Sequence, residues 1–329
     1  MSKYPKVPEK IIRKLAKAKG IKKLNGKSIE DIETAIVEAG HEEDLNHLAS
    51  EFAFTKSSCG LIIEKPLTPF AEEINSPEKL IKLLLERKLI PHNFRGLVNW
   101  QTDYDDKVRI CGFYQEGDTV FINTVQRRYT KIKNGWNGTT TSAYADFIPV
   151  AIHFDNCLLE FRTTTTYFAN VKSFIMELLL YEGDFKYETL TKLTNKDANR
   201  IKALLQAGFS SEEIAIPSTV GTFKWTSSKG KYDLENDLLI AKFKQFLRDN
   251  SLPSDDRMVV TVHLEEYEDE VTKVKFPVTF NINIKSGSIK FNSVVTQGVI
   301  DHVVDAIIKV TYIEKLLELE EQEVKETVI

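Results

Sequence analysis

Three aspartates that could hold a metal ion lie close together in the sequence, at Asp103, Asp105 and Asp106. Hard cations such as Mg²⁺ bind carboxylate oxygens, so this cluster is compatible with a metal-dependent nuclease or hydrolase. A solvated turn has a similar composition, and a strand-like run follows directly from Val108 to Tyr114. We favour the turn and keep the metal-dependent enzyme as an alternative.

Other residues that could catalyse a reaction or bind a metal are scattered. Cys59, Cys111 and Cys157 form no C-x-x-C pair, and Cys111 lies in an apolar run that favours a buried thiol. The sequence contains no phosphate-binding glycine-rich loop, nucleophile elbow or dinucleotide fingerprint. It therefore predicts no catalytic residue, no metal site and no cofactor. The six histidines also lack metal-ligand spacing: His41, His47, His92, His153, His263 and His302.

Basic and aromatic residues gather in one segment, VQRRYTKIKNGWNG, which begins at Val125. A strand here would place four of these side chains on one face: Arg127, Tyr129, Lys131 and Lys133. Arg128 lies beside them, and the glycine-rich tip carries Trp136. Basic groups bind phosphates and rings stack on bases, so the segment predicts a nucleic-acid contact. The alternative is an ordinary hairpin whose charges keep an edge strand soluble.

A second basic segment lies at the N-terminus, where Pro8 to Lys19 reads as an amphipathic helix. Its polar side carries four basic candidates for nucleic-acid contact: Lys10, Arg13, Lys14 and Lys17. The first 23 residues contain nine basic residues and one acid, a net charge of +8, whereas Glu314 to Glu326 contains six Glu and two Lys, a net of −4. This asymmetry favours contact with nucleic acid or a membrane surface at the basic end, or attraction between the two ends.

Helix and strand signals divide the chain into four blocks of an α+β fold. Residues 1–92 are predicted to form a helical domain, with Ser28 and Ser76 before its helices. Residues 93–183 are rich in β-branched and aromatic residues from Gly96 onwards, which predicts an antiparallel sheet with a covering helix. Residues 184–253 form a mostly helical insert, in which Thr194 and Ser210 each start a helical segment. Residues 254–329 form a second sheet and helix, ending in an acidic helix.

Two segments share one pattern, because Ile148 to Leu179 and Phe276 to Ile308 each read strand, turn, strand and helix. The proposed matches pair Ile148-Pro149-Val150 with Phe276-Pro277-Val278, Leu159-Glu160-Phe161 with Ile289-Lys290-Phe291, and Asp106–Ile110 with Asp256–Val260. We interpret the pattern as an internal duplication. The alternative is two ordinary sheet-and-helix units that look alike.

Strand alternation in the second copy places polar candidates on the face opposite the helix: Asn281, Asn283, Lys285 and Lys290. Amide and ammonium groups suit the edge of a nucleic-acid groove. This duplicated sheet with one helix per half resembles the saddle of TATA-binding proteins, over roughly Asp103 to Ile308 without the insert. The resemblance implies a sheet laid along DNA. The phenylalanines that act as wedges between bases in that family have no match here. The equivalent pair in this repeat is Phe161 and Phe291, and strand alternation turns both side chains inward.

The chain has 329 residues, of which 42% are hydrophobic and 28% charged, as expected for a globular protein of two or three domains. No apolar run approaches the roughly 18 residues of a membrane span, so we predict no membrane partner and a cytoplasmic location, or a nuclear one in a eukaryote. The leading hypothesis is a non-enzymatic nucleic-acid-binding protein. A protein-interaction subunit or homo-oligomer and a metal-dependent nuclease or hydrolase are the alternatives.

Overall fold

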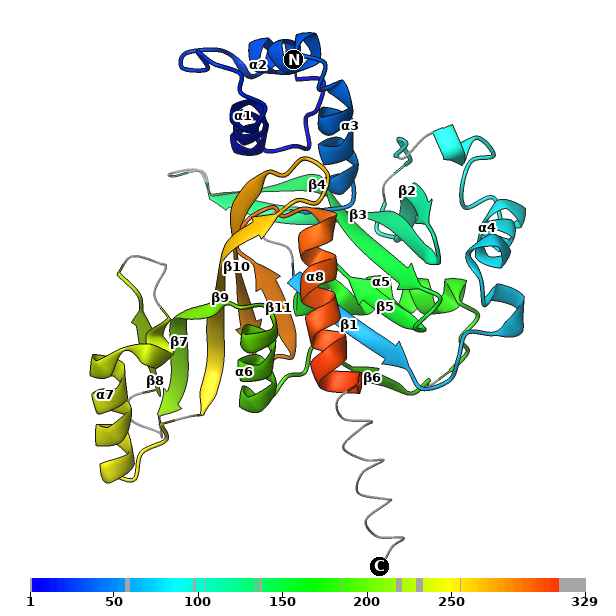
Figure 1. Ribbon diagram of the computed structural model, residues 1–329. Coiled ribbons are helices and arrows are strands. Elements are labelled where there is room, and N and C mark those ends of the chain that lie inside the picture. The colour runs from blue at the N-terminus through cyan, green and yellow to red at the C-terminus, as the bar shows by residue number, and fades with distance from the viewer. Residues whose placement is uncertain are drawn as a thin grey trace, which may run out of the picture. The chain divides into compact units, whose positions relative to one another are not determined.

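The computed structural model describes residues 2–56, 60–96, 99–103, 105–133, 135, 138–183, 185–216, 221–228, 233–254 and 256–313. Helices and antiparallel strands make up two compact units, so the chain is a mixture of helix and sheet, as predicted (Figure 1). The continuous unit is Gly60–Thr189, and the split unit combines Met1–Cys59 with Leu190–Ile329. No helix within the described ranges is long and apolar enough to cross a membrane.

Three short helices begin the split unit: α1 (Glu9–Ala18), α2 (Ile29–Glu38) and α3 (Glu42–Glu51). The hydroxyl of Ser28 accepts a hydrogen bond from the Asp31 N–H, and the Asp31 carboxylate accepts one from the Ser28 N–H. This capping box satisfies two backbone donors at the start of α2. α1 buries Ile12 and Leu15 completely, as its apolar stripe predicts.

The continuous unit contains an antiparallel sheet in the order β2-β3-β4-β5-β1, with β6 paired to β1. Its strands are β1 (Gly60–Pro66), β2 (Arg109–Glu116), β3 (Thr119–Lys133), β4 (Thr139–His153), β5 (Leu158–Phe161) and β6 (Tyr187–Thr189). Its helices are α4 (Pro77–Glu86) and α5 (Thr165–Leu178), with short 3-10 turns at Glu72–Ile74 and Phe94–Gly96. Val171 and Ile175 of α5 are fully buried in one core with Val150 and Phe161 of the sheet.

The split unit contains a second antiparallel sheet in the order β11-β10-β9-β7-β8. Its strands are β7 (Gly208–Ile216), β8 (Gly221–Thr226), β9 (Arg257–Glu268), β10 (Lys275–Asn283) and β11 (Ser288–Phe291). α6 (Asn195–Leu204) and α8 (Gln297–Ile308) lie over β9 to β11, and α7 (Leu238–Asp249) lies beside β7 and β8 (Figure 1). A 3-10 turn at Leu234–Asn236 precedes α7, and a π-helical turn at Lys309–Ile313 follows α8.

The structure confirms that Phe161 and Phe291, the pair compared with the wedge phenylalanines of TATA-binding proteins, turn inward. Phe161 and Phe291 are 0% and 1% exposed, and Phe291 pairs across the sheet with buried Phe280. Neither ring can therefore act as a surface wedge between bases.

Four segments differ from the sequence prediction. Gly60–Pro66 lies inside the predicted helical domain but forms β1, which pairs with β5. Ser210, predicted to start a helical segment, lies in β7, and Gly221–Thr226 also forms a strand in the predicted helical insert. The run Ser-Ser-Glu-Glu resembles a helix start, but tertiary partners of Glu212 stabilise it as a strand. In the segment Gly96 to Trp100, predicted as a strand, Asn99 makes an isolated bridge to Gly112.

The strand registers also correct the residue matches between the two similar segments. Phe161 pairs with Val150, and Phe291 pairs with Phe280, so the counterpart of Val150 is Phe280 rather than Val278. Asp106–Ile110 leads into β2, whereas Asp256–Val260 leads into β9, the neighbour of β10. These strands occupy different positions, so their proposed match was wrong.

Candidate nucleic-acid interface

The segment with alternating basic and aromatic residues forms the far part of a long two-stranded ribbon. β3 and β4 pair continuously from Thr119 opposite His153 to Lys133 opposite Thr139. β2 accompanies β3 as far as Val125, and β5 accompanies β4 as far as Val150. Beyond these residues the two strands have no other strand partner among the described residues. We call residues 127–133 and 139–145 the ribbon arm.

The ribbon arm is exposed and basic. Tyr129 is 57% exposed and Ile132 50%, whereas the same two strands bury Val120 and Ile152 completely in the sheet. The sequence from Arg127 to Ala145 contains four basic residues and no acid. Lys131 and Lys133 form no ion pair with any carboxylate that the structure describes. Their ammonium groups are therefore available to bind phosphate.

Arg127 and Arg128 have structural partners at the base of the arm. The Nε of Arg127 lies 3.2 Å from a carboxylate oxygen of Asp106. The guanidinium of Arg128 lies 4.4 Å from the ring centroid of Tyr167 on α5, and its Nε is 3.8 Å from Asp146. Such contacts fix the direction of the arm and leave these two arginines less free than the lysines to bind a ligand.

Two of the three aspartates considered for a metal site, Asp105 and Asp106, contact arginines. Asp105 accepts a hydrogen bond from Arg109 at 2.6 Å, and this bond together with one from the Lys107 N–H lowers the pKa of Asp105 to about 2. Asp106 pairs with Arg127 as described above. Within the described part of the chain, no group of three or more His, Cys, Asp or Glu residues is arranged to hold a metal ion. The metal-dependent alternative gains no support from this geometry.

The four basic residues of α1 divide into two pairs. Arg13 binds Glu9 at 2.6 Å and donates to two backbone carbonyls that follow α1, and Lys14 donates to the Lys275 carbonyl at 2.9 Å. Lys10 and Lys17 are exposed. Among the described contacts, Lys10 and Lys17 have no ion pair, so this second pair suits the predicted contact better than Arg13 and Lys14.

The polar row on the second sheet is shorter than predicted. Asn281 lies opposite exposed Lys290, and its side chain accepts a hydrogen bond of 3.4 Å from Asn292. Asn283 ends β10, and its side chain accepts from the Ser286 N–H at 3.0 Å. Lys285 therefore lies in the turn that follows β10, not on the strand. These amides mainly stabilise the sheet and its turn.

Two predicted features lie outside the described residues. They are Trp136 at the tip of the hairpin and the acidic segment that begins at Glu314.

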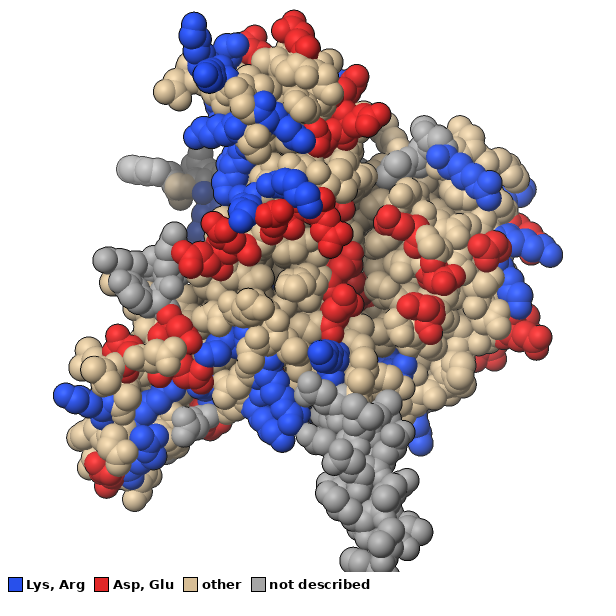
Figure 2. Space-filling view, viewed as in Figure 1, with Lys and Arg blue, Asp and Glu red and all other residues tan. Residues whose placement is uncertain are grey.

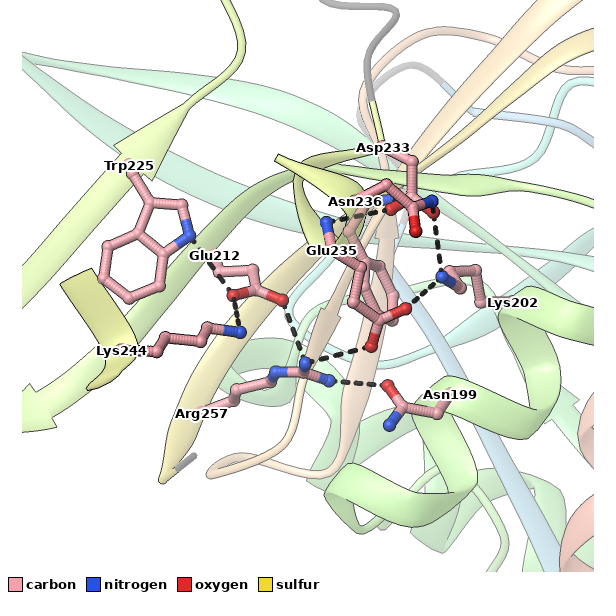
Figure 3. A network of polar contacts seen from close by, with 10 residues as sticks. Asn199, Lys202, Glu212, Trp225, Asp233, Glu235, Asn236, Lys244 and Arg257 are labelled. Atoms are coloured by element: carbon pink, nitrogen blue, oxygen red, sulfur yellow. Dashed lines mark hydrogen bonds and ion pairs between the residues drawn. The ribbon is translucent and has the colours of Figure 1, made fainter. Parts of the chain in front are cut away.

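Sequence reasoning missed a buried charged network in the split unit (Figure 3). Glu212 of β7 is fully buried and lies 2.8 Å from Lys244 and 3.0 Å from Arg257, while the indole N–H of Trp225 donates to it at 3.2 Å. Arg257 also donates to Asn199 at 2.6 Å. The network ties β8, α6 and α7 to the central strands. No local pattern could reveal it, because Asn199 and Arg257 are 58 residues apart.

Comparison with known proteins gives no relative from which function could be inferred. No protein-family model matches the sequence, and no curated protein matches it. The proposed function therefore depends on the geometry of this chain.

Proposed function

We propose that the protein binds nucleic acid through the ribbon arm without acting on it as an enzyme. The observation that carries this proposal is the exposed, paired ribbon in which Lys131 and Lys133 pair with none of the described carboxylates. The major groove of B-form DNA admits a two-stranded β-ribbon, so double-stranded DNA is the preferred ligand. In this proposal the two lysines bind phosphates, and Tyr129 contacts a sugar or base.

A fluorescence anisotropy titration of the whole chain tests this proposal. The probes are one double-stranded and one single-stranded oligonucleotide, each measured at two salt concentrations. We expect binding that weakens steeply with salt and favours the duplex. Absence of binding to either probe at a salt concentration of about 50 mM would refute the proposal.

We also infer that the two sheets descend from an internal duplication. Two observations support this inference: each unit orders four antiparallel strands before a helix, and a four-residue connection joins β4 to β5 and β10 to β11. The sets are β2-β3-β4-β5 before α5, and β7-β9-β10-β11 before α8. A test is to express residues 60–189 alone, because an independent module should unfold cooperatively in urea.

A second candidate function, protein interaction, is favoured by the surface around α7. Leu238, Leu239 and Phe246 are 80%, 74% and 56% exposed, and β8 is the edge strand of its sheet. Exposed apolar side chains beside a strand edge suit a protein partner or a second copy. Sedimentation of the wild type and of Leu239→Lys tests whether this surface associates with another copy.

A further inference from the structure

A pocket of about 620 Å³ opens in the continuous unit between the chain that follows α4, the beginning of β2, and α5. Its described lining carries four side chains that are basic or can become so: Lys88, His92, Lys107 and Arg109. The rest of its described lining is apolar or neutral and includes no Asp or Glu. A pocket with this charge selects an anion.

Two of the cations are available to a ligand. Lys88 and Lys107 are exposed, and neither forms an ion pair with a described carboxylate. Arg109 is bound to Asp105 at 2.6 Å and serves as a more rigid part of the rim. Two adaptable ammonium groups beside a fixed guanidinium suit a phosphate or polyphosphate.

The remainder of the lining is unsuited to an inorganic anion alone. Trp100, Val108 and Phe174 are partly buried side chains that pack against the core of the unit, so their positions are set by that packing. The backbone N–H of Trp100 donates to the Cys111 carbonyl at 2.8 Å, which attaches the loop to β2. Indole and phenyl rings held in this way offer stacking surfaces to a planar group.

We propose that this pocket binds a phosphorylated aromatic base, with phosphate on Lys88 and Lys107 and the base against Trp100. Its volume is within the range of small-molecule sites, roughly 300–1,000 Å³. The ligand is either a free nucleotide or the phosphorylated end of a nucleic-acid strand, because both present the same chemistry. The proposal rests on the pocket and does not require the ribbon arm to bind nucleic acid.

Calorimetric titration of the whole chain with ATP, AMP, adenosine and inorganic pyrophosphate tests whether the pocket recognises both the phosphate and the base. We expect AMP and ATP to bind, and adenosine and pyrophosphate to bind at least about tenfold more weakly. Equal affinity for pyrophosphate would overturn the role of the base, and equal affinity for adenosine would overturn the role of the phosphate.

Variants locate the site. Lys88→Glu/Lys107→Glu should weaken nucleotide binding by about tenfold or more, and Trp100→Leu by about tenfold. The matched control is Lys82→Glu/Lys186→Glu, which makes the same charge change at exposed lysines of the same unit outside the pocket. The proposal is wrong if the control weakens binding as much as the pocket variant. Thermal unfolding verifies that Trp100→Leu remains folded, and the lysine pair tests the site independently of it.

Oligonucleotides with and without a 5′-phosphate distinguish the two sources of ligand. The background is Lys131→Ala/Lys133→Ala, which removes the two arm lysines that pair with no described carboxylate. Binding of free nucleotides in this background identifies a nucleotide site, and binding only of the phosphorylated strand identifies a strand-end site. If neither binds, the pocket proposal fails whether or not the wild-type chain binds duplex DNA.

Discussion

Two hairpins at corresponding places in the two sheets have opposite character. In the continuous unit, the hairpin β3–β4 is followed by the short strand β5 and then by α5. In the split unit, the hairpin β9–β10 is followed by the short strand β11 and then by α8. The first carries four basic residues and no acid from Arg127 to Ala145. The second, from Glu265 to Lys275, carries five acids and two lysines, a net charge of −3. A common strand arrangement thus supports a basic extension in one unit and an acidic turn in the other.

The acidic hairpin is folded onto its own unit. Asp269 accepts hydrogen bonds from the backbone and hydroxyl of Thr272 at 2.7 and 2.6 Å, and lies 3.2 Å from His47 of α3. Acidic side chains gather over α8 and the adjoining β9–β10 turn (Figure 2), where they line a pocket of about 730 Å³. There, burial and the charges of Glu51 and other acids raise the pKa of Tyr267 to about 12. This hairpin is bound to its own unit by side-chain contacts, whereas Lys131 and Lys133 of the ribbon arm form no ion pair with a described carboxylate.

Exposure, and not charge alone, therefore distinguishes a candidate interface. Arg13 and Arg128 lie in basic segments, but both have structural partners. Arg13 pairs with Glu9, and the guanidinium of Arg128 lies over the ring of Tyr167. Lys131 and Lys133 lack such partners within the described residues.

The largest expected effect concerns the buried ion pair of each sheet. Arg162 is 1% exposed and donates to fully buried Glu160 at 2.7 Å. Arg162→Met should lower the free energy of unfolding by about 3–5 kcal/mol, because a buried carboxylate loses its principal partner. Arg257→Met should cost only about 1–3 kcal/mol, because Lys244 still lies 2.8 Å from Glu212. Urea unfolding measures both, and equal losses would mean that Lys244 does not compensate.

A pH series tests the buried Glu160–Arg162 ion pair of the continuous unit in a second way. Burial alone would raise the pKa of Glu160, but Arg162 and His153 lower it to about 2. A lowered pKa gives stability that is present above the unfolded value, about 4.5, and is lost as the pH falls toward 2. The stability difference between wild type and Glu160→Gln should therefore shrink by roughly 3 kcal/mol between pH 6 and pH 2. A difference that does not change with pH would contradict this assignment.

A smaller effect is expected for the exposed ring of the arm. Tyr129→Ala should weaken binding of a duplex by about 1 kcal/mol, roughly fivefold, because a contact to sugar or base is lost. Tyr114→Ala is the control, since Tyr114 is a 40% exposed tyrosine on β2, outside the arm. Anisotropy titrations compare the two variants, and an equal loss in both would remove Tyr129 from the interface.

The smallest effect is expected for the acidic hairpin. Glu266→Gln/Glu268→Gln removes two exposed carboxylates that pair with Lys275 at 3.2 and 3.4 Å. Affinity for duplex DNA at about 0.15 M salt should change less than about twofold, because in this proposal these carboxylates make no contact with the duplex. A tenfold gain in affinity would indicate that the acidic hairpin repels the ligand directly and would break the distinction between the two hairpins.

Local signals made much of this fold predictable. Ser28, Ser76 and Thr194 each cap a helix where the sequence places one, because cap residues act within three or four positions. Strand alternation likewise predicted that Phe161 and Phe291 turn inward. Such features depend on neighbours along the chain.

Features that depend on distant partners were not predictable. Glu212 reads as the start of a helix, and only Arg257 and Lys244, far along the chain, explain its burial in a strand. The sequence predicted the candidate site as a basic segment. It could not predict which basic residues have structural partners: Arg128 lies over the ring of Tyr167, whereas Lys131 pairs with no described carboxylate. The pocket was missed because its lining extends from Lys88 to Phe174.

The most direct test of the ribbon arm is the salt dependence of duplex binding by Lys131→Ala/Lys133→Ala. Each lost phosphate contact reduces the slope of log K against log salt by about 0.9, so the slope should become shallower by about 2. The matched control, Lys82→Ala/Lys186→Ala, removes the same charge from exposed positions elsewhere in the continuous unit and should keep the wild-type slope. Equal slopes for wild type and the arm variant would contradict a nucleic-acid contact at the ribbon arm.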